Sequence, residues 1–258
     1  MEYGIAFQSL IPVRSTPAHA AEQTTQLLFG EMYTVQEERE DWLRVINQYD
    51  QYIGWIHRKQ HHALTYAEAE KLLQTKFSVA AELVQTISNN DRSFPILMGS
   101  TLYDFDGMNF RIGKEKFVYA GQAVNEESGL LNGEHIRRFS MKFLHAPYQW
   151  GGRSPFGIDC SGLTQVVFKL YGVHLPRDAY QQADMGKTLH FIHEGREGDL
   201  AFFDNEDGRI THVGILLGND QIIHASGCVR LDAVDHYGIY NKELKKYTHK
   251  LRIIKRVV

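Results

Sequence analysis

A cysteine at the start of a predicted helix is the most reactive group in the sequence. Cys160 follows a glycine-rich, proline-containing loop at residues 148–157, and apolar residues recur after it at helical spacing. The pattern predicts a helix that begins near Cys160 and that Gly172 ends. Asp159 is a suitable N-cap, so the sulfur lies where unpaired N–H groups and the helix dipole favour negative charge. We therefore expect a lowered thiol pKa and a nucleophilic thiolate, with a buried structural cysteine as the alternative.

Two histidines lie on predicted strands downstream. Residues 199–204, 210–217 and 221–226 are strand-like runs separated by turn signals, which predicts an antiparallel arrangement. His212 and His224 would then lie on one face, opposite or nearly opposite each other. Such a pair supplies a general base and a polar group that holds its ring in one tautomer. Two satisfied structural histidines are the alternative.

The C-terminal half, from about Glu134, carries several motifs in a fixed order. They are Tyr148-x-Trp-Gly-Gly152, Asp159-Cys-Ser-Gly162, Leu175-Pro-Arg-Asp178 with Gln182, Gly198-Asp-Leu200, Thr211-His-Val-Gly214 and Ile223-His-Ala-Ser226. In order and spacing they resemble the catalytic domain of NlpC-type cysteine peptidases, papain-like enzymes that cut bacterial cell-wall peptides. The resemblance implies Cys160 as nucleophile, His212 as general base and His224 as the third polar residue. It also implies that Tyr148 and the Cys160 N–H lie near the oxyanion, with a packing role as the alternative for Tyr148.

The first 125 residues contain many short strand-like runs. Over about the first 60 residues, their turn spacing suggests a small barrel. Leu28-Phe-Gly-Glu31 and Gly54-Trp-Ile56 within it resemble a bacterial SH3-like domain. The pattern Thr65-x-x-Glu68 is a capping box that opens a helix. Further runs between residues 95 and 119 are interpreted as a second, divergent SH3-like module.

The chain as a whole is predicted to have an α+β fold. It resembles a papain-like NlpC-type catalytic domain preceded by two small SH3-like β-barrel modules. The charged and glycine-containing region from Asn125 to Gly133 is expected to mark the boundary. The expected domains are residues 1–62 for the first SH3-like domain, 63–76 for a linking helix, 77–125 for the second SH3-like domain and 126–258 for the peptidase.

SH3-like modules followed by a peptidase resemble one subgroup of that family. Its members are γ-D-glutamyl-L-diamino acid endopeptidases that require a free N-terminal L-alanine on the murein peptide and release L-Ala-D-Glu. A buried substrate ammonium needs carboxylates and hydroxyls around it. Ala179 stands where the subgroup often has serine, which removes one hydroxyl contact. By motif position the resemblance implies that the substrate pocket is lined by Glu31, Tyr66, Trp150, Asp159, Ser161 and Asp178.

Each of three pocket residues has a simpler alternative. Glu31 could be a solvated turn residue, Tyr66 a packing residue at a helix start, and Asp178 a structural hydrogen-bonding group.

Composition and charge give no support to several other classes. A net charge of −3 without a basic cluster offers nothing for nucleic acid or an anionic membrane surface. No run reaches the ~18 apolar residues that a membrane span needs.

Cys160 and Cys228 are too few for a secreted disulfide framework, so we expect two free thiols. No metal or other cofactor is expected, because no tight ligand spacing is present. The expected partner is the murein peptide L-Ala-γ-D-Glu-diamino acid, bound by a monomer.

The N-terminal residues bear on the cellular compartment. The N-terminus has no basic region and no long apolar run, so we expect no signal peptide and favour the cytoplasm. A periplasmic or secreted location would follow if a native leader had been removed.

The alternatives to peptide hydrolysis are a non-hydrolytic wall-binding protein and a papain-like amidase or acyltransferase with another substrate. The intact set of Cys160, His212 and His224 argues against the first alternative.

Overall fold

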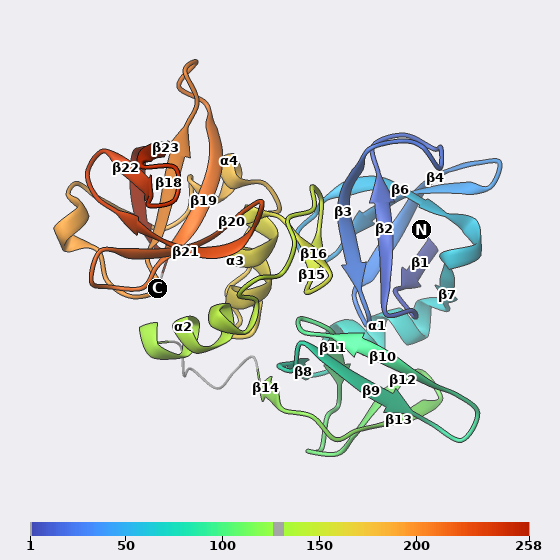
Figure 1. The fold of residues 1–258 in the computed structure, drawn as a ribbon. Coiled ribbons are helices and arrows are strands. Elements are labelled where there is room, and N and C mark those ends of the chain that lie inside the picture. Colours follow the sequence, from blue (N-terminus) through green and yellow to red (C-terminus); the bar gives the residue numbers. More distant parts are fainter. Residues whose placement is uncertain (1, 126–131, 258) are drawn as a thin grey trace. The chain divides into compact units, whose positions relative to one another are not determined.

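The structure, a computed structural model, describes residues 2–125 and 132–257. Figure 1 shows its strands and helices, which divide into two compact units. The first unit contains the described residues up to 125, Trp150–Pro155 and Lys169–His174, and the second contains the rest of the C-terminal half. The three predicted N-terminal pieces therefore lie in one unit. The expected boundary at residues 125–133 falls mostly outside the described residues, and the domain limits stay predictions.

A sheet of short strands forms the N-terminal part of the first unit. The strands are β1 (Glu2–Ile5), β2 (Leu10–Arg14), β3 (Gln23–Leu28), β4 (Met32–Arg39), β5 (Trp42–Asn47), β6 (Ile53–His57) and β7 (His62–Leu64). Their order is β3-β2-β6-β5-β4-β1-β7, with antiparallel neighbours throughout. Gly30, between β3 and β4, has φ +81°, and a Cβ there would overlap the carbonyl oxygen of Thr101. Only glycine fits this turn.

A helix and two smaller sheets complete the first unit. The helix is α1 (Tyr66–Gln74), and the strands are β8 (Phe77–Ala80), β9 (Val84–Ser88), β10 (Ser93–Leu97), β11 (Thr101–Tyr103), β12 (Asn109–Ile112), β13 (Glu115–Tyr119) and β14 (Ala123–Asn125). The predicted capping box is confirmed, since Thr65 Oγ1 accepts from the Glu68 N–H and Glu68 Oε2 accepts from the Thr65 N–H. The strand orders are β10-β9-β13-β12 and β11-β8-β14.

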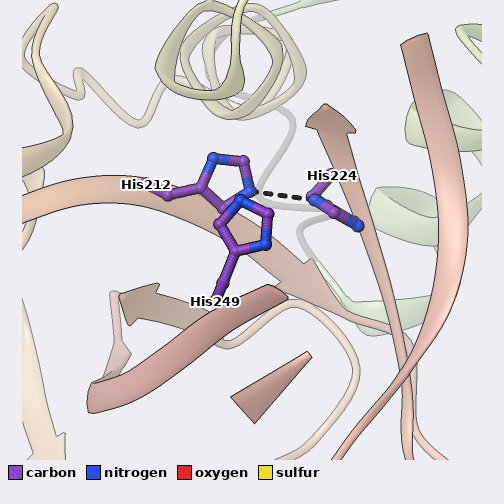
Figure 2. Close-up of side chains that lie close together, drawn as sticks. All are labelled: His212, His224 and His249. Atoms are coloured by element: carbon purple, nitrogen blue, oxygen red, sulfur yellow. Dashed lines mark hydrogen bonds between the residues drawn. The ribbon is translucent and has the colours of Figure 1, made fainter. Parts of the chain in front are cut away.

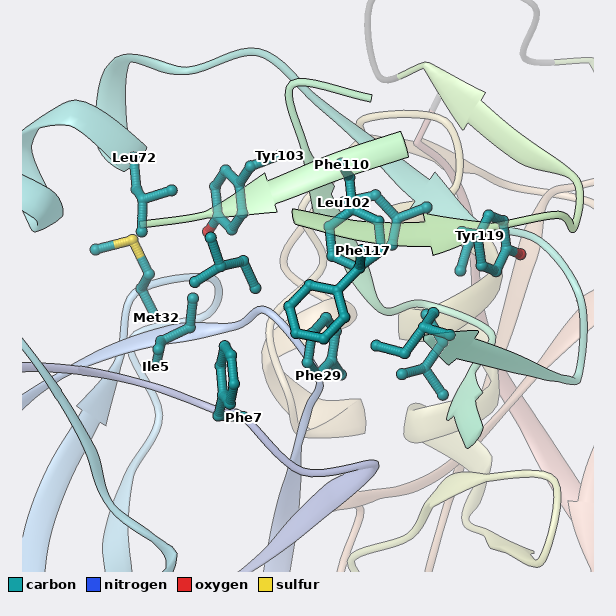
Figure 3. Packing of buried hydrophobic residues seen from close by; sticks show 14 of the residues in the cluster. Ile5, Phe7, Phe29, Met32, Leu72, Leu102, Tyr103, Phe110, Phe117 and Tyr119 are labelled. Atoms are coloured by element: carbon teal, nitrogen blue, oxygen red, sulfur yellow. The ribbon is translucent and has the colours of Figure 1, made fainter. Parts of the chain in front are cut away.

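One aromatic core joins the two N-terminal modules. Phe29, directly after β3, is completely buried, and its ring centroid lies 5.7 Å from those of Phe7 and Phe94. The rings of Phe110 and Phe117, from β12 and β13, lie 5.9 and 6.1 Å away. Figure 3 shows side chains of both modules packed around this centre. The sequence predicts separate modules, whereas the structure gives them a common core.

The second unit combines helices with a closed sheet. Its helices are α2 (Gly133–Lys142), α3 (Cys160–Lys169, with Lys169 assigned to the first unit) and α4 (Ala179–Gln182). Outside the main sheet are β15 (Arg153–Ser154, in the first unit) and β16 (Gly157–Ile158), and a 3-10 turn, η3, spans Ile192–Glu194. The main strands are β17 (Lys187–Leu189), β18 (Leu200–Asp204), β19 (Ile210–Leu216), β20 (Gln221–Ser226), β21 (Cys228–Val234), β22 (Gly238–Asn241) and β23 (Lys246–Arg256).

The main sheet of the second unit closes into a barrel. Its order is β17-β23-β18-β19-β20-β21-β22, and β22 also pairs with β23. Gly238 has φ +141°, and a Cβ there would overlap the carbonyl oxygen of His249 across this closing pair. The three strands predicted between residues 199 and 226 are confirmed as β18, β19 and β20. Among the described residues, no helix has the length and hydrophobicity to span a bilayer.

Replacing the central ring of the aromatic core should destabilise the first unit. Phe29→Ala removes a fully buried ring, so we expect a loss of about 3–5 kcal/mol in unfolding free energy, measured by urea denaturation. Phe191→Ala is the control, because Phe191 is 60% exposed and should change stability by about 0.5 kcal/mol or less. Equal effects of the two changes would contradict the assignment of Phe29 to the core.

Candidate active site

Cys160 is the first residue of α3, as the sequence predicts. The Gly162 N–H donates to Asp159 Oδ1 at 2.7 Å, which confirms Asp159 as the N-cap. The backbone N–H groups of Val213 and Ser161 point at the sulfur. Because Val213 follows His212 on β19, these contacts bring the thiol to the strand that carries the predicted base. Cys160 and Cys228 are both free, as expected.

The thiol is less acidic than its helix position suggests. Burial, followed by the charge of Asp159, raises the pKa of Cys160 to about 12, against the opposing effect of the Val213 N–H. Cys160 is only 7% exposed, so desolvation outweighs the helix terminus. The prediction of a lowered thiol pKa is therefore wrong. The resting sulfur is a thiol, and a base must remove its proton during attack.

A buried ion pair holds the N-terminus of α3. Arg177 donates from Nη1 to Asp159 Oδ1 at 3.0 Å and from Nη2 to Asp159 Oδ2 at 2.5 Å. The same Nη1 donates to Ser161 Oγ at 2.8 Å. All three side chains are buried, and a buried carboxylate is tolerated when it is paired in this way. Asp159 and Ser161 thus order the nucleophile's helix turn, and their contact with substrate stays a prediction.

Gln182, the last residue of α4, links this helix to α3. Its Nε2 donates to the Ser161 and Pro176 carbonyls, and its Oε1 accepts from Thr164 Oγ1 at 2.7 Å. Asp178 is half-buried and is the N-cap residue of α4. The motif residue Gln182 therefore has a structural task, and the substrate role of Asp178 stays a prediction.

His212 and His224 meet on one face of the barrel sheet, as predicted. Gly214 lies directly opposite His224, which places His212 diagonally across from it. His212 Nε2 and His224 Nδ1 are 2.9 Å apart, as Figure 2 shows. A Cβ on Gly214 would approach His224 Cβ to 3.0 Å and the Ile222 side chain to 2.6 Å. The glycine of the Thr-His-Val-Gly motif therefore makes room for Ile222 and His224 on the neighbouring strand.

A carboxylate from β21 extends the pair. Asp232 Oδ2 lies 3.0 Å from His224 Nε2 and accepts from Arg230 Nε at 2.7 Å. Burial opposes ionisation of Asp232, but hydrogen bonds from His224 and Arg230 hold its pKa below the ordinary value. An ionised carboxylate only accepts, so the proton of His224 lies on Nε2. Its Nδ1 must then accept from His212 Nε2, which leaves His212 Nδ1 unprotonated.

The charge state of His212 suits a general base. Burial, followed by the neighbouring His224 and His249, lowers the pKa of His212 well below its ordinary value. The ring is therefore neutral at pH 7, and its unprotonated Nδ1 can accept a proton. The sequence alone does not reveal which ring nitrogen is free, because Asp232 determines it.

Sequence reasoning misses two residues of this region. Asp232 belongs to a strand that the sequence does not predict, although the pair Arg230-x-Asp232 has the period of one strand face. His249, on β23, stacks on His212 with 4.2 Å between ring centroids. His212, His224 and His249 each have a ring nitrogen within 4.8 Å of the others, so three imidazoles are available to a metal ion. Their separation in the sequence explains why no ligand spacing is visible there.

Glu31 lies in the first unit at the centre of a buried ion-pair cluster. Its Oε1 accepts from Arg153 Nη2 and Lys169 Nζ, at 2.9 and 2.6 Å. Its Oε2 accepts from Arg153 Nη1 and the Leu28 N–H, at 2.7 and 2.9 Å. The two cations overcome the effect of burial and lower the pKa of Glu31 to about 2. Glu31 is therefore no solvated turn residue, and its oxygens are already engaged, so its predicted contact with a substrate ammonium stays without support.

The aromatic residues assigned to the pocket are exposed. Tyr66 begins α1 and is 64% exposed, and Trp150 is 61% exposed with its Nε1 donating to Glu22 at 2.6 Å. Both belong to the first unit, whereas Tyr148 belongs to the second. Burial, followed by the charge of Cys160, raises the pKa of Tyr148 to about 12, so its hydroxyl stays protonated near the sulfur. The roles of the three residues in binding or oxyanion stabilisation stay predictions.

Comparison with known proteins agrees with this geometry. Residues 145–252 match the NlpC/P60 family, and residues 13–60 match the bacterial dipeptidyl-peptidase Sh3 domain. A gamma-D-glutamyl-L-lysine dipeptidyl-peptidase of Bacillus subtilis (strain 168) is 33% identical over 218 residues, which cover 78% of this chain and 71% of the relative. The chain belongs to the NlpC/P60 family. The predicted cysteine peptidase with an N-terminal SH3-like domain is thereby confirmed.

Two further comparisons extend the likeness over most of the chain. Dipeptidyl-peptidase 6 of Lysinibacillus sphaericus is 27% identical over 226 residues, which cover 80% of this chain and 81% of the relative. The crystal structure of an NlpC/P60 family protein from Bacillus cereus ATCC 10987 has a TM-score of 0.84 at 19% identity, over 99% of both chains. This likeness shows a shared fold and confirms the predicted α+β architecture. The family match also contains Cys160, His212 and His224.

Changing Asp232 should slow catalysis with little effect on substrate binding. The side-chain amide of Asp232→Asn places an NH₂ group against Arg230 or against His224. In the first case it weakens the hydrogen bonds that link Asp232, His224 and His212, and in the second it favours the wrong tautomer of His224. We expect kcat to fall at least about tenfold at nearly constant KM, since disturbing the orienting carboxylate of a catalytic triad costs more than this.

The alkylation rate of Cys160 by iodoacetamide should fall as well, because the base is misaligned. Asp207→Asn is the matched control, since Asp207 is exposed in a turn of the same unit. An unchanged kcat and alkylation rate in Asp232→Asn would show that Asp232 does not orient His224 and His212.

The Glu31 cluster should make stability depend on pH. Because its folded-state pKa of about 2 lies below the ordinary 4.5, the stabilisation by ionised Glu31 is complete above about pH 4.5 and is lost as pH falls towards 2. Glu31→Gln should cost about 3–5 kcal/mol at pH 7, since it leaves buried cations unpaired. Its deficit relative to the unchanged protein should shrink at pH 3, measured by urea unfolding.

Glu38→Gln serves as the comparison, because the Glu38–Arg58 pair is half exposed. Its loss should be about 1 kcal/mol or less at both pH values. A deficit of Glu31→Gln that does not change with pH would show that the carboxylate is not the titrating group.

Proposed function

We propose that this protein hydrolyses the γ-D-glutamyl-L-diamino acid bond of murein peptides that carry a free N-terminal L-alanine, releasing L-Ala-D-Glu. The proposal rests on the hydrogen-bonded array of His212, His224 and Asp232. His212 lies on β19, the strand whose Val213 N–H contacts the Cys160 sulfur. The B. subtilis relative is named for the γ-D-glutamyl-L-lysine bond, which supports this choice of bond. The same substrate class follows from the motif set of the sequence.

The array drives acylation by moving one proton. As Cys160 attacks the γ-carboxamide carbon of D-glutamate, His212 Nδ1 accepts the thiol proton and the ring becomes an imidazolium. His224 accepts from the protonated ring at Nδ1, while Asp232 fixes the opposite nitrogen of His224. The imidazolium then donates its proton to the leaving amine of the diamino acid, and the C–N bond breaks. A neutral thiol and a neutral base thus react without a preformed ion pair.

Hydrolysis of the thioester uses the same groups in reverse. Water loses a proton to His212 Nδ1 as it attacks the acyl carbon. His212 then donates this proton to the sulfur as the thioester bond breaks, so Cys160 becomes a thiol again. The oxyanion of each tetrahedral intermediate is stabilised by the Cys160 N–H at the start of α3, with Tyr148 as a second donor. The raised pKa of Tyr148 keeps its hydroxyl a donor at neutral pH.

The requirement for a free amine defines the physiological substrate. Released murein peptides carry a free N-terminal L-alanine, whereas peptides attached to the intact wall do not. We therefore propose a recycling role for a monomer in the cytoplasm. Asp178, in the same unit as Cys160, is the proposed contact of the N-terminal dipeptide.

The first test compares two forms of one peptide. L-Ala-γ-D-Glu-meso-diaminopimelate should be cleaved to L-Ala-D-Glu, followed by liquid chromatography and mass spectrometry, and its N-acetylated form should not. We expect kcat/KM to fall at least about 30-fold on acetylation, because losing one partner of a buried charge pair costs about 2 kcal/mol or more.

Cys160→Ser is the matched control and should abolish cleavage while its thermal unfolding stays unchanged. Equal cleavage of the acetylated peptide would reject the free-amine requirement. Cleavage by Cys160→Ser at a substantial rate would reject the nucleophile.

A further inference from the structure

Three imidazoles converge inside the barrel of the second unit. His212, His224 and His249 come from β19, β20 and β23, and Figure 2 shows their rings side by side. The His249 ring lies nearly parallel to that of His212, at 27°, while the His224 ring crosses it at 87°. One nitrogen of each ring lies within 4.8 Å of the other two. The peptidase mechanism gives His249 no part.

A hydrogen bond to Thr248 engages one nitrogen of His249. The Thr248 hydroxyl oxygen lies 2.9 Å from His249 Nδ1 and 3.4 Å from the Ile239 carbonyl oxygen. In the tautomer with the proton on Nδ1, Nε2 carries the lone pair that a metal ion would bind. Neutral imidazole whose other nitrogen is fixed by a hydrogen bond is the form that binds metal ions.

His224 is already supported as a metal ligand would be. Asp232 holds the His224 Nε2–H, which directs the lone pair of Nδ1 towards the other rings. A carboxylate behind a ligating histidine is the usual second shell of a zinc site. The proton in the hydrogen bond between His212 Nε2 and His224 Nδ1 prevents both nitrogens from binding a metal ion at the same time. Moving it to His212 Nδ1 frees both nitrogens without net release of a proton.

Three nitrogen ligands select a class of metal. Imidazoles favour Zn²⁺, Co²⁺, Ni²⁺ and Cu²⁺ over Mg²⁺ and Ca²⁺, which prefer oxygen ligands. A Zn–N length of about 2.0–2.1 Å in a tetrahedral site separates the nitrogens by about 3.3 Å. The His212–His224 separation of 2.9 Å would open slightly, and the His249 ring would turn inward, to reach this spacing.

We propose that His212, His224 and His249 form an inhibitory binding site for a divalent transition-metal ion such as Zn²⁺. Metal binding places the remaining proton of His212 on Nδ1, so this nitrogen no longer accepts the proton of Cys160. Peptide cleavage stops, and a chelator restores it by returning the proton to Nε2. The site itself is independent of the proposed function, and only its inhibitory effect rests on that function.

Binding can be measured without peptidase activity in the full-length Cys160→Ser protein, which also lacks the thiol as a ligand. Co²⁺ titrated into this protein should bind with a stoichiometry of one and produce visible d–d absorption. Adding His249→Gln should weaken binding at least about tenfold, the scale on which zinc sites respond to loss of a supporting group. Adding His193→Gln, a change of an exposed histidine in the same unit, should leave the affinity unchanged.

Inhibition is then measured in the protein with Cys160 intact. Zn²⁺ should inhibit cleavage of the murein tripeptide, and EDTA should reverse the inhibition. His249→Gln should raise the inhibition constant at least about tenfold, relative to its own metal-free rate. His249→Asn provides a second variant, and thermal unfolding identifies any variant that fails to fold.

Two results would overturn the site. One is loss of Co²⁺ binding in Cys160→Ser, which would assign the metal to the thiol. The other is equal affinity in folded His249→Gln and its parent. If the protein with Cys160 intact shows no peptidase activity, but Co²⁺ still binds in Cys160→Ser and this binding depends on His249, the proposed function is rejected and the metal site is supported.

Discussion

The contact between Asp232 and His224 sets the chemistry of the catalytic unit. A carboxylate held ionised by Arg230 and His224 can only accept, and this fixes the proton on one nitrogen of His224. The tautomer of His212 follows, because two unprotonated or two protonated nitrogens would not form the bond between the rings. The arrangement is possible because β19, β20 and β21 are consecutive neighbours in the sheet. The position of the lone pair on His212 is therefore set by three adjacent strands.

Desolvation, not the helix dipole, governs the resting state of the nucleophile. A helix terminus stabilises an anion by about 0.3–1 kcal/mol when exposed, whereas burial shifts a pKa by several units. The raised pKa of Cys160 and the lowered pKa of His212 both favour the neutral pair. Charge then appears only as the bond to substrate forms, where the oxyanion and the imidazolium can stabilise each other.

Local patterns predict local structure well in this chain. The capping box at Thr65, the helix start at Cys160 and the shared face of His212 and His224 depend on neighbours within a few residues or on one hairpin. The environment of Glu31 could not be predicted in this way, since its partners Arg153 and Lys169 are 122 and 138 residues away.

Asp232 and His249 escape prediction for a related reason. They lie on strands whose sequences contain no motif. Asp232 reaches His224 through the pairing of β21 with β20, and His249 comes from β23, which pairs with β18 in the same sheet. The pKa of Cys160 depends on burial, which a linear motif does not report. What the sequence predicts is therefore the identity of the reacting groups, and what it omits is the surroundings that set their protonation.

The position of Arg153 has a consequence for evolution and for protein engineering. Although it belongs to the glycine-rich motif before Cys160, its guanidinium is neutralised by Glu31 and its N–H is bound by Gln26. A peptidase excised at the apparent sequence boundary would retain a cation whose counter-ion had been discarded. Exchange of the N-terminal half among homologues should thus succeed only when the donor supplies an equivalent acid, so the two halves of the gene are expected to be inherited together.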